Sequence, residues 1–424
     1  METKKSFAFG YSMVAFGFLG FFLTTYFDVM SPNIFVPALA EAHGFAPAAL
    51  LAAHSIGGIC GAILGFVLGK LIERVGPKKV FIVTAIISGI NFGLIGVATT
   101  QSWACFHIFV NQLLVLGYSM MSLLALMARW FPRKKGIVMG FITSGSIGSG
   151  IVIMPIGAKL AATQGIMVSQ CVVGALLVIL GIIAIFWVKD TPAEAGLEPD
   201  NQPMTPEELE IAKWHAEHPS SWTPIKVLTC PTMWILLLCA GFITIGNLGT
   251  QTSGAGILGE AGLSPGAALA LVGAGGLVGF VGSNFSGILD QKTSSYTSTI
   301  VMYAIAMIGL ILLAFGSGTV AAAGFVCQGA VVGAVNNLLP SHIITRFGAE
   351  NYDAIYDICC PLNRLMASLG AMIMSFSLAN TGLYKTGLMI LMALSIIALV
   401  MFIFSGGTKH VESPAEKEGL IAKA

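Results

Sequence analysis

Long apolar runs, separated by short polar segments, follow one another along the whole chain. A helix needs about 20 mostly apolar residues to cross the hydrocarbon core of a bilayer. Because the runs are continuous, they do not fit the alternating pattern of membrane β-strands. The pattern therefore predicts an all-α integral membrane protein with about twelve transmembrane helices. We expect them at roughly 9–37, 47–69, 79–98, 103–129, 137–162, 166–188, 230–256, 265–289, 297–316, 318–345, 354–378 and 383–405.

Composition supports this class. The chain is 56% hydrophobic and only 10% charged, whereas a soluble protein carries about 25% charged residues. Such a small number of charges cannot cover a water-facing surface. Most of the chain therefore faces lipid or packs against other parts of the protein. A net charge of +1 gives no indication of nucleic-acid binding. The eight cysteines lie in or beside the apolar runs, and we interpret them as small apolar residues rather than disulfide partners.

Lysine and arginine in the short loops predict the orientation. Most of these residues lie at one set of span ends, and the other set carries little beyond Lys159 and Lys385. Because cytoplasmic loops are enriched in basic residues, we expect both termini in the cytoplasm and a multi-pass protein of the plasma (cell inner) membrane. The first run is too long for a signal peptide and lacks a small-residue cleavage site. The basic set of span ends carries Lys4, Lys5, Lys70, Arg74, Lys78, Lys79, Arg129, Arg133, Lys134, Lys135, Lys292, Arg346 and Lys409.

One long polar segment divides the chain. Residues 190–226 are rich in proline and charge, and Thr205-Pro206-Glu207-Glu208 is a typical helix start. We interpret this segment as a cytoplasmic linker with one short amphipathic helix. It separates a first six-helix bundle, 1–189, from a second, 227–405, which is followed by a cytoplasmic tail, 406–424.

The two halves repeat a glycine pattern. Small residues recur every four positions in the second span and again in the eighth. This spacing forms a flat stripe that lets another helix backbone approach closely. The shared register favours internal duplication, hence two pseudo-symmetric bundles. The stripes are Gly57, Gly61, Gly65 and Gly69, and Gly275, Gly279, Ser283 and Gly287.

A related turn follows each stripe. The first, "GKLIERVGPKK", resembles the second-to-third loop of the major facilitator superfamily, Gly-x-Leu-x-Asp-Arg-x-Gly-x-Lys. The second, "GILDQKTSS", has Asp290 one place early and no following arginine. The resemblance implies that fold, with a loop that helps to lock one face of a transporter through charge contacts with neighbouring helix ends. The matching residues are Gly69, Leu71, Arg74, Gly76 and Lys78, with Glu73 where Asp is usual.

A second resemblance points to a branch of the superfamily. "RWFPRKKGIVMGF", from Arg129 to Phe141, resembles the fourth-to-fifth loop of the oxalate/formate antiporter and monocarboxylate transporter branch. "LTCPTMWIL" is similar to the start of that branch's seventh span. This resemblance implies secondary transport of an organic anion. The sequence has no nucleotide-binding loop, metal-ligand cluster or catalytic triad pattern, so we expect neither an enzyme nor a cofactor or metal.

Arg364 lies in the eleventh span, about 15 Å deep if the helix rises 1.5 Å per residue. An arginine at mid-membrane costs roughly 2.5–3.5 kcal/mol, so it faces the bundle interior or a wet cavity. The antiporters have a substrate-binding lysine here, followed at the third and fourth places by Ala-Ser, as Arg364 is by Ala367 and Ser368. The resemblance makes Arg364 the candidate anion-binding cation. A structural ion pair with Asp357, assisted by a kink at Pro361, is the alternative.

Two further positions bear on the substrate. Where the oxalate transporters have a second cation in the eighth span, this chain has Gly282, which favours a monoanion or zwitterion. Asp28 lies in the outer half of the first span, where a carboxylate is costly. A buried carboxyl group keeps its proton more readily than one in water, as a coupling site requires. Asp28 could instead hold a substrate ammonium group, or stay hydrated near the interface.

Weaker candidates complete the site. Proton coupling has the candidates Asp28, Asp357 and His107. His342 and Arg346 are expected at the cytoplasmic rim. Seven polar residues of the cavity-lining helices either bind substrate or join helices by hydrogen bonds. They are Tyr26, Asn111, Gln112, Asn247, Gln251, Asn336 and Asn337.

The leading hypothesis is a monomeric secondary transporter that moves a small organic monoanion, monocarboxylate-like, by alternating access. Proton symport or exchange for a counter-anion would drive it. Arg364 and Asp28 would both reach a shared central cavity. The rival hypothesis is proton-coupled efflux of amphipathic cations or drugs, with Asp28 as the cation ligand.

Overall fold

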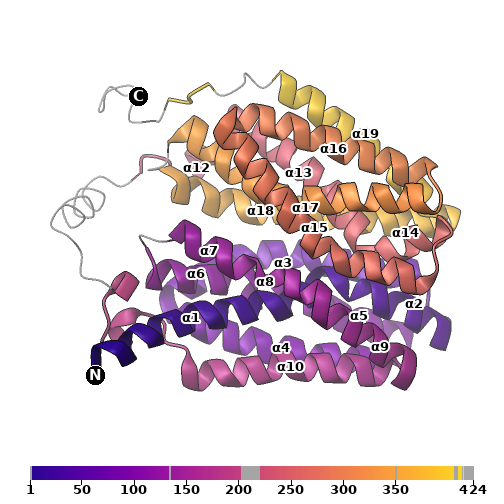
Figure 1. The fold of residues 1–424 in the computed structure, drawn as a ribbon, viewed down its shortest axis with the longest axis horizontal. Helices are drawn as coiled ribbons and strands as arrows, with labels where there is room; N and C mark the ends of the chain where they lie inside the picture. The colour runs from indigo at the N-terminus through magenta and orange to yellow at the C-terminus, as the bar shows by residue number, and fades with distance from the viewer. Residues whose placement is uncertain are drawn as a thin grey trace. The chain divides into compact units, whose positions relative to one another are not determined.

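The computed structural model describes residues 2–132, 135–201, 220–348, 351–404, 409–412 and 414. The regular elements of these residues are all helices (Figure 1). Twelve of them are long and apolar enough to cross a membrane. They coincide with the twelve predicted apolar runs to within a few residues at most ends, so the predicted fold class is confirmed. The amphipathic helix expected at Thr205 lies outside the described residues.

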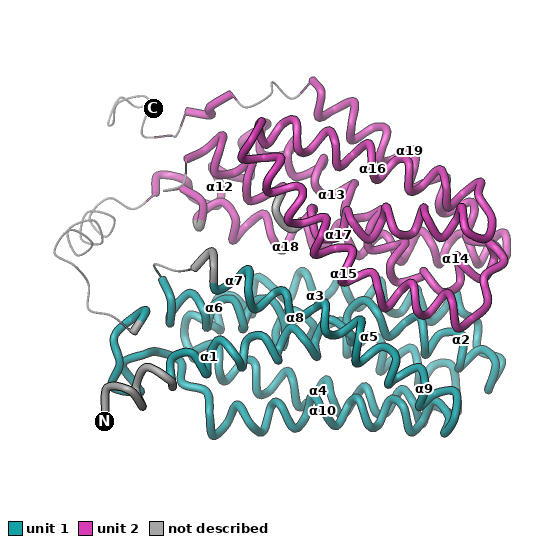
Figure 2. The backbone as a smooth tube through the Cα atoms, viewed as in Figure 1, with its two compact units in different colours: residues 1–218 teal, residues 219–424 magenta. Residues whose placement is uncertain are grey.

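The chain forms two compact units, Met1–His218 and Pro219–Ala424, shown in different colours in Figure 2. Six of the spans lie in each. The first unit contains α1 (Glu2–Thr25), the π-helical η1 (Tyr26–Met30), α2 (Pro32–His43), α3 (Pro47–Val75), α4 (Pro77–Gly96), α5 (Gln101–Tyr118), α6 (Met120–Trp130), α7 (Lys135–Thr143), α8 (Gly145–Gly148), the π-helical η2 (Ser149–Ile153), α9 (Met154–Gln164), α10 (Ile166–Trp187), and the 3₁₀ turns η3 (Pro192–Ala195) and η4 (Pro199–Asn201).

The second unit begins with a short helix and continues with six long ones. Its elements are α12 (Pro224–Leu228), α13 (Pro231–Thr252), α14 (Gly254–Glu260), α15 (Pro265–Lys292), α16 (Ser295–Phe315), α17 (Thr319–Phe347), α18 (Tyr352–Thr381) and α19 (Lys385–Ile403). We call the span ends that carry Lys70, Arg74, Lys78, Arg129 and Arg346 the basic end of their unit.

Local chemistry explains where the spans start. Proline opens α3, α4, α13 and α15, where its missing N–H has no helical partner to lose. A hydroxyl caps other starts. The Thr100 side chain accepts from the backbone N–H of Trp103 (3.3 Å) at α5, and Ser294 accepts from that of Thr297 (3.1 Å) at α16.

The glycine stripes lie at helix contacts inside each unit. A Cβ atom on Gly61 would lie 2.6 Å from the carbonyl oxygen of Gln112, which places α3 against α5. In the second unit a Cβ atom on Gly333 would lie 1.7 Å from the carbonyl oxygen of Gly279, where α15 meets α17. No larger residue permits this approach. The eighth-span stripe is not used along its whole length, because a Cβ on Gly287 would meet nothing within 4 Å.

Away from the basic end, a carboxylate joins the short helix α14 to the start of α19 in the second unit. Both carboxylate oxygens of Glu260 accept from the backbone N–H of Tyr384, at 2.8 and 3.0 Å, just before α19 begins. Partial burial raises the pKa of Glu260 above its ordinary value, and the hydrogen bond from Tyr384 partly offsets this. The next residue, Ala261, accepts from the N–H of Gly318 (2.7 Å). This corner therefore ties α14 to the segments before α17 and α19.

Gly333 of α17, which faces the stripe, and Gly287 of the stripe itself give a matched test. Gly333→Ala should destabilise the purified protein by about 1–3 kcal/mol, because the methyl group meets a backbone oxygen that cannot move aside. Gly287→Ala should leave the thermal unfolding temperature unchanged or slightly raised, since its methyl group enters open space and alanine favours the helix. Equal unfolding temperatures for both variants would contradict this account of the packing.

Candidate functional site

Asp28 lies in a π-helical segment that interrupts the first span. The segment, Tyr26–Met30, follows α1 directly and precedes Pro32. Single π turns in helices leave carbonyl groups without their usual partners and occur often at functional sites. Here the side-chain amide of Gln112 donates to the carbonyls of Phe27 (3.3 Å) and Asp28 (3.4 Å). The polar side chain of α5 thus holds the interruption in place.

His54 of α3 supports the same segment. Its Nε2 lies 2.9 Å from the carbonyl oxygen of Asp28, and its side chain is buried. Because a carbonyl oxygen only accepts, Nε2 carries the proton in this bond. Two neighbouring helices therefore fix the backbone of Asp28, whose side chain is half-buried. A carboxylate held at a rigid position in the membrane fits a coupling or binding role.

Other candidates of the first unit bond within the bundle. Asn111 donates to the carbonyl of Ser88 (3.4 Å) and accepts from the Tyr118 hydroxyl (3.1 Å). The Nδ1 atom of His107 lies 2.6 Å from Oδ1 of Asn91. These contacts favour interhelical bonding for Asn111 and His107 over contact with substrate.

Tyr26 is enclosed among helices of the first unit. Its side chain is 0% exposed and its ring meets Phe92 edge-on, with centroids 5.9 Å apart. The hydroxyl lies so close to Gly157 that a Cβ atom there would be 2.5 Å from it. Its expected role in binding substrate stays a prediction.

Arg364 lies near the middle of the eleventh span. It follows the start of the span at Ala354 by ten residues, which is about 15 Å of helix, as the sequence predicts. The span runs from Ala354 to Thr381, so Arg364 is about three residues from its centre. Its side chain is half-buried and Asp357 is exposed. Cys360 lies between them along the helix.

The backbone around Arg364 is fixed by α13. Asn363 accepts from the hydroxyl of Thr244 (3.0 Å), and Ser368 donates to the carbonyl of Arg364 (3.1 Å). Six residues after Arg364, a Cβ atom on Gly370 would lie 2.2 Å from the carbonyl oxygen of Ile245. Such a close helix contact makes the base of the Arg364 side chain rigid.

Of the remaining polar candidates of the second unit, Asn247 and Gln251 have described side chains. Asn247 is buried and donates to the carbonyl of Gln328 (3.1 Å), which joins α13 to α17. Gln251 is buried, with its Oε1 near Gly275 of α15. The side chains of Asn336 and Asn337 lie outside the described residues.

Gly282 of α15, where the sequence comparison looked for a second cation, is tightly packed. A Cβ atom on Gly282 would lie 2.0 Å from the carbonyl oxygen of Ala330 in α17. The contact leaves no room at this residue for a side chain of any size. Among the described residues, no group of three or more His, Cys, Asp and Glu side chains is arranged to hold a metal ion.

The basic end of the first unit is organised by Asp190. The carboxylate of Asp190 accepts from the backbone N–H of Lys78 (2.8 Å) in the first turn of α4. Gly76, between α3 and α4, has φ +92° and lies against the same carboxylate. Only glycine adopts this backbone without strain and leaves this space. The Lys78 ammonium donates to the carbonyl of Ile185 (2.9 Å), so α4 is joined twice to the end of α10.

The fourth-to-fifth loop contributes two further contacts there. Arg129 donates to the carbonyl of Ile72 (3.1 Å) at the end of α3, a favourable place for a cation. The Trp130 indole N–H donates to the carbonyl of Lys189 (2.8 Å). The side chains of Glu73 and Arg74 are exposed. Sequence reasoning missed Asp190, which carries no motif of its own.

The second copy of the loop is built differently. Asp290 accepts from the Ser341 hydroxyl of α17, and the α16 start is capped by its own Ser294. His342 and Arg346, expected at the rim, are buried in the bundle, 3% and 1% exposed. The Nε2 atom of His342 lies 2.8 Å from the Thr299 hydroxyl. The second loop copy, which lacks most of the superfamily motif, is therefore held by other contacts than those that Asp190 makes in the first copy.

The Asp190 contact predicts a graded loss of stability. Asp190→Ala should cost about 0.5–2 kcal/mol of stability, because it removes the acceptor for a helix-start N–H. Asp190→Asn keeps an acceptor oxygen and should stay closer to wild type. Gly76→Ala should lower the thermal unfolding temperature at least as much as Asp190→Ala, since it adds backbone strain. A normal unfolding temperature for Gly76→Ala would show that this turn does not need glycine.

Comparison with known proteins places the fold. The crystal structure of the nucleoside transporter NupG superposes with a TM-score of 0.67 at 13% identity, covering 94% of this chain and 98% of that one. A bacterial homologue of the human lysosomal transporter Spinster, in an inward-facing and occupied conformation, gives 0.68 at 14% identity, covering 92% and 96%. A search of curated protein sequences finds no match. The family model of the Major Facilitator Superfamily matches residues 13–359, so the chain belongs to the Major Facilitator Superfamily of transporters.

Proposed function

We propose that this transporter moves a small organic monoanion, monocarboxylate-like, and that Arg364 binds its carboxylate. The observation that carries the proposal is a half-buried guanidinium about three residues from the centre of a span. An arginine facing lipid there costs roughly 2.5–3.5 kcal/mol, so an intramembrane arginine is by default a candidate for a functional site. A planar guanidinium binds a carboxylate by two parallel hydrogen bonds.

The alternative is an ion pair between Arg364 and Asp357, which lies two helical turns earlier on the same face of α18. Asp357 precedes Arg364 by seven residues, about 10.5 Å of rise. Asp357 is exposed, whereas Arg364 is half-buried. Thr244 bonds to Asn363, and Ser368 bonds to the carbonyl of Arg364, so the helix around Arg364 is held in place. This suits a binding residue, because a side chain already held in position loses less entropy when a ligand binds.

A single negative charge on the substrate follows from the packing of the eighth span. The oxalate-transporting relatives place a second cation there, and Gly282 abuts the backbone of α17 instead. One guanidinium balances one carboxylate. A dicarboxylate bound by Arg364 alone would keep one charge without a partner in a poorly hydrated site. Amino acids stay possible substrates if Asp28 holds their ammonium group.

Coupling is assigned to Asp28. It is half-buried, and His54 and Gln112 fix its backbone within a π-helical segment. In proton symport Asp28 would bind and release the proton. In anion exchange it would only shape the site. The basic span ends would face the cytoplasm of a plasma-membrane protein, with both termini on that side.

The charge of Arg364 gives the first test. Arg364→Gln should abolish uptake of a radiolabelled monocarboxylate into proteoliposomes, because glutamine keeps polar volume but cannot neutralise the anion. Arg364→Lys should retain part of the activity, since a point charge replaces the planar fork. Lys159→Gln, the same charge change at an exposed position, is the control and should transport normally. Normal uptake by Arg364→Gln would end the anion proposal and favour cation efflux.

The Asp28 carboxylate gives the second test. In proton symport, Asp28→Asn should prevent uphill accumulation under an imposed pH gradient but spare exchange of labelled for unlabelled substrate. If Asp28 grips a substrate ammonium group, both activities should disappear. Glu41→Gln, an exposed carboxylate on the following helix α2, should change neither. Full uphill accumulation by Asp28→Asn would remove Asp28 from the coupling mechanism.

A further inference from the structure

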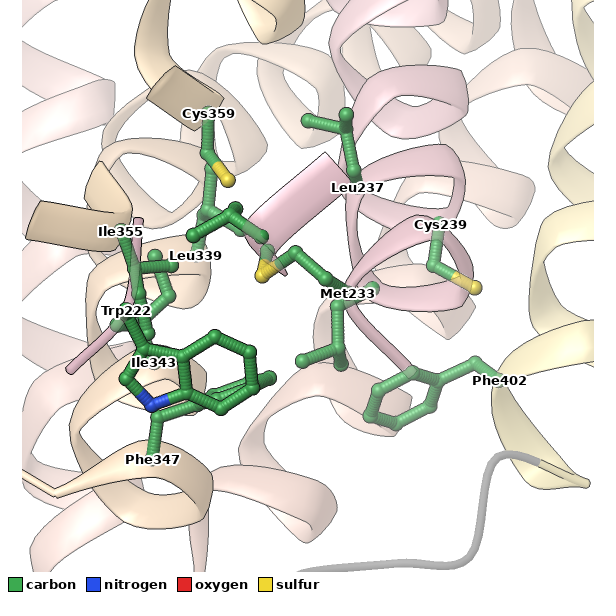
Figure 3. Packing of buried hydrophobic residues seen from close by; sticks show 12 residues of the cluster. Trp222, Met233, Leu237, Cys239, Leu339, Ile343, Phe347, Ile355, Cys359 and Phe402 are labelled. Carbon is green, nitrogen blue, oxygen red and sulfur yellow. The ribbon is translucent and has the colours of Figure 1, made fainter. Parts of the chain in front are cut away.

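The end of the linker is packed into the second unit at its basic end. Trp222, just before α12, is 5% exposed. Its ring meets Phe347 edge-on, with centroids 5.3 Å apart. Figure 3 shows Trp222 beside Ile343 and Phe347, the last residues of α17, with Ile355 of α18 close by. A large aromatic buried among two helix ends contributes strongly to holding them together.

Hydrogen bonds reinforce this contact. The Ser220 hydroxyl donates to Oδ1 of Asn351 (2.6 Å), and the Asn351 amide donates to the carbonyl of Phe347 (2.8 Å). The backbone N–H of Trp222 donates to Ser220 in turn (3.3 Å). The linker end therefore contacts both the last turn of α17 and the residue before α18. Since the Trp222 indole nitrogen has no hydrogen-bond partner among the described residues, the ring acts through its apolar area.

Both helices that hold Trp222 contain a proline just beyond the contact. Pro340 lies inside α17 and Pro361 inside α18. A proline lacks the N–H for the carbonyl four residues earlier, so each helix has a weak point at which bending costs least. Between the prolines lies the α17–α18 tip, which we define as residues 341–348 and 351–360. Its buried members Ile343, Phe347 and Ile355 all contact the Trp222 cluster.

We propose that Trp222 is a clamp that holds the α17–α18 tip in the observed position and that the tip moves about Pro340 and Pro361 when the clamp opens. Arg364 lies about one turn beyond Pro361 on α18, so movement of the tip about Pro361 would change the direction in which the Arg364 side chain points. Trp222 is thus a positioning residue for Arg364. This last link rests on the proposed function, whereas the clamp itself does not.

Two native cysteines of the same cluster allow a test that needs no substrate. Cys359 belongs to the tip and is 1% exposed, whereas Cys239 lies on α13, outside the tip, and is 2% exposed. Two proteins are made, each with only one of these cysteines. Their rates of alkylation by N-ethylmaleimide are measured with and without Trp222→Ala. Opening of the tip exposes Cys359 and leaves Cys239 covered.

The clamp predicts selective labelling. Trp222→Ala should raise the rate at Cys359 at least about 10-fold, because truncating a buried tryptophan shifts the local opening equilibrium. The rate at Cys239 should change less than about 2-fold, since α13 lies outside the tip. Trp222→Phe should restore slow labelling because it keeps the ring on Phe347. Trp103→Ala, at an exposed tryptophan of α5 in the first unit, is the control and should change neither rate.

Two results would overturn the clamp. One is an unchanged rate at Cys359 in Trp222→Ala; the other is an equal rise at Cys359 and Cys239, which means general loosening. If Trp222→Ala does not fold, Ser220→Ala replaces it, and a rise confined to Cys359 is again required.

The link to Arg364 has its own readout. In monocarboxylate uptake, Trp222→Ala and Ser220→Ala should change Vmax and leave KM unchanged, because they alter tip movement and not the carboxylate contact, whereas Trp222→Phe should leave both unchanged. Faster Cys359 labelling with unchanged uptake kinetics would overturn the link to Arg364 and leave the clamp. Absence of uptake by the wild-type protein would contradict the proposed function alone, since the labelling test does not use it.

Discussion

Direct contact between helix backbones at glycine is the interaction on which both units depend. Lipid is as apolar as leucine, so the hydrophobic effect does not drive helices together inside a membrane and close packing must do so. The contacts of α3 with α5, of α15 with α17, and of α13 with α18 all place a glycine against a carbonyl oxygen of the partner helix. Residues Gly61, Gly282, Gly333 and Gly370 take part. This packing leaves room for few polar side chains.

The polar groups that remain inside the spans are mostly satisfied by neighbouring helices. Asn111, Gln112 and Asn247 bond to backbone carbonyls, and His54 bonds to the carbonyl of Asp28. Such bonds stabilise the bundles and hold a few charged positions in fixed geometry. Arg364 and Asp28 are the charges whose place in the spans packing alone does not explain. The proposed function gives each a role, with Arg364 as the ligand of a carboxylate and Asp28 as the coupling group.

The sequence predicts much of the fold, because membrane thickness and apolar length are directly readable from it. The twelve spans, the two glycine stripes and the superfamily all follow from local patterns. The π-helical segment at Asp28 does not, since it depends on donors from α3 and α5 that are distant in the sequence. Asp190 and Trp222 lie outside any motif, and their partners become visible only in three dimensions. The second copy of the loop matches the superfamily motif poorly, and it is held by a different contact, between Asp290 and Ser341.

The central claim is that a carboxylate binds at Arg364. It is tested most directly by thermal unfolding of the purified protein with a panel of monocarboxylates, dicarboxylates, amino acids and cationic dyes. A ligand at 100 times its Kd stabilises the folded state by about 2.7 kcal/mol, enough to raise the unfolding temperature measurably. We predict a rise with small monocarboxylates that is absent in Arg364→Gln. A rise with cationic dyes alone, retained in Arg364→Gln, would contradict the account.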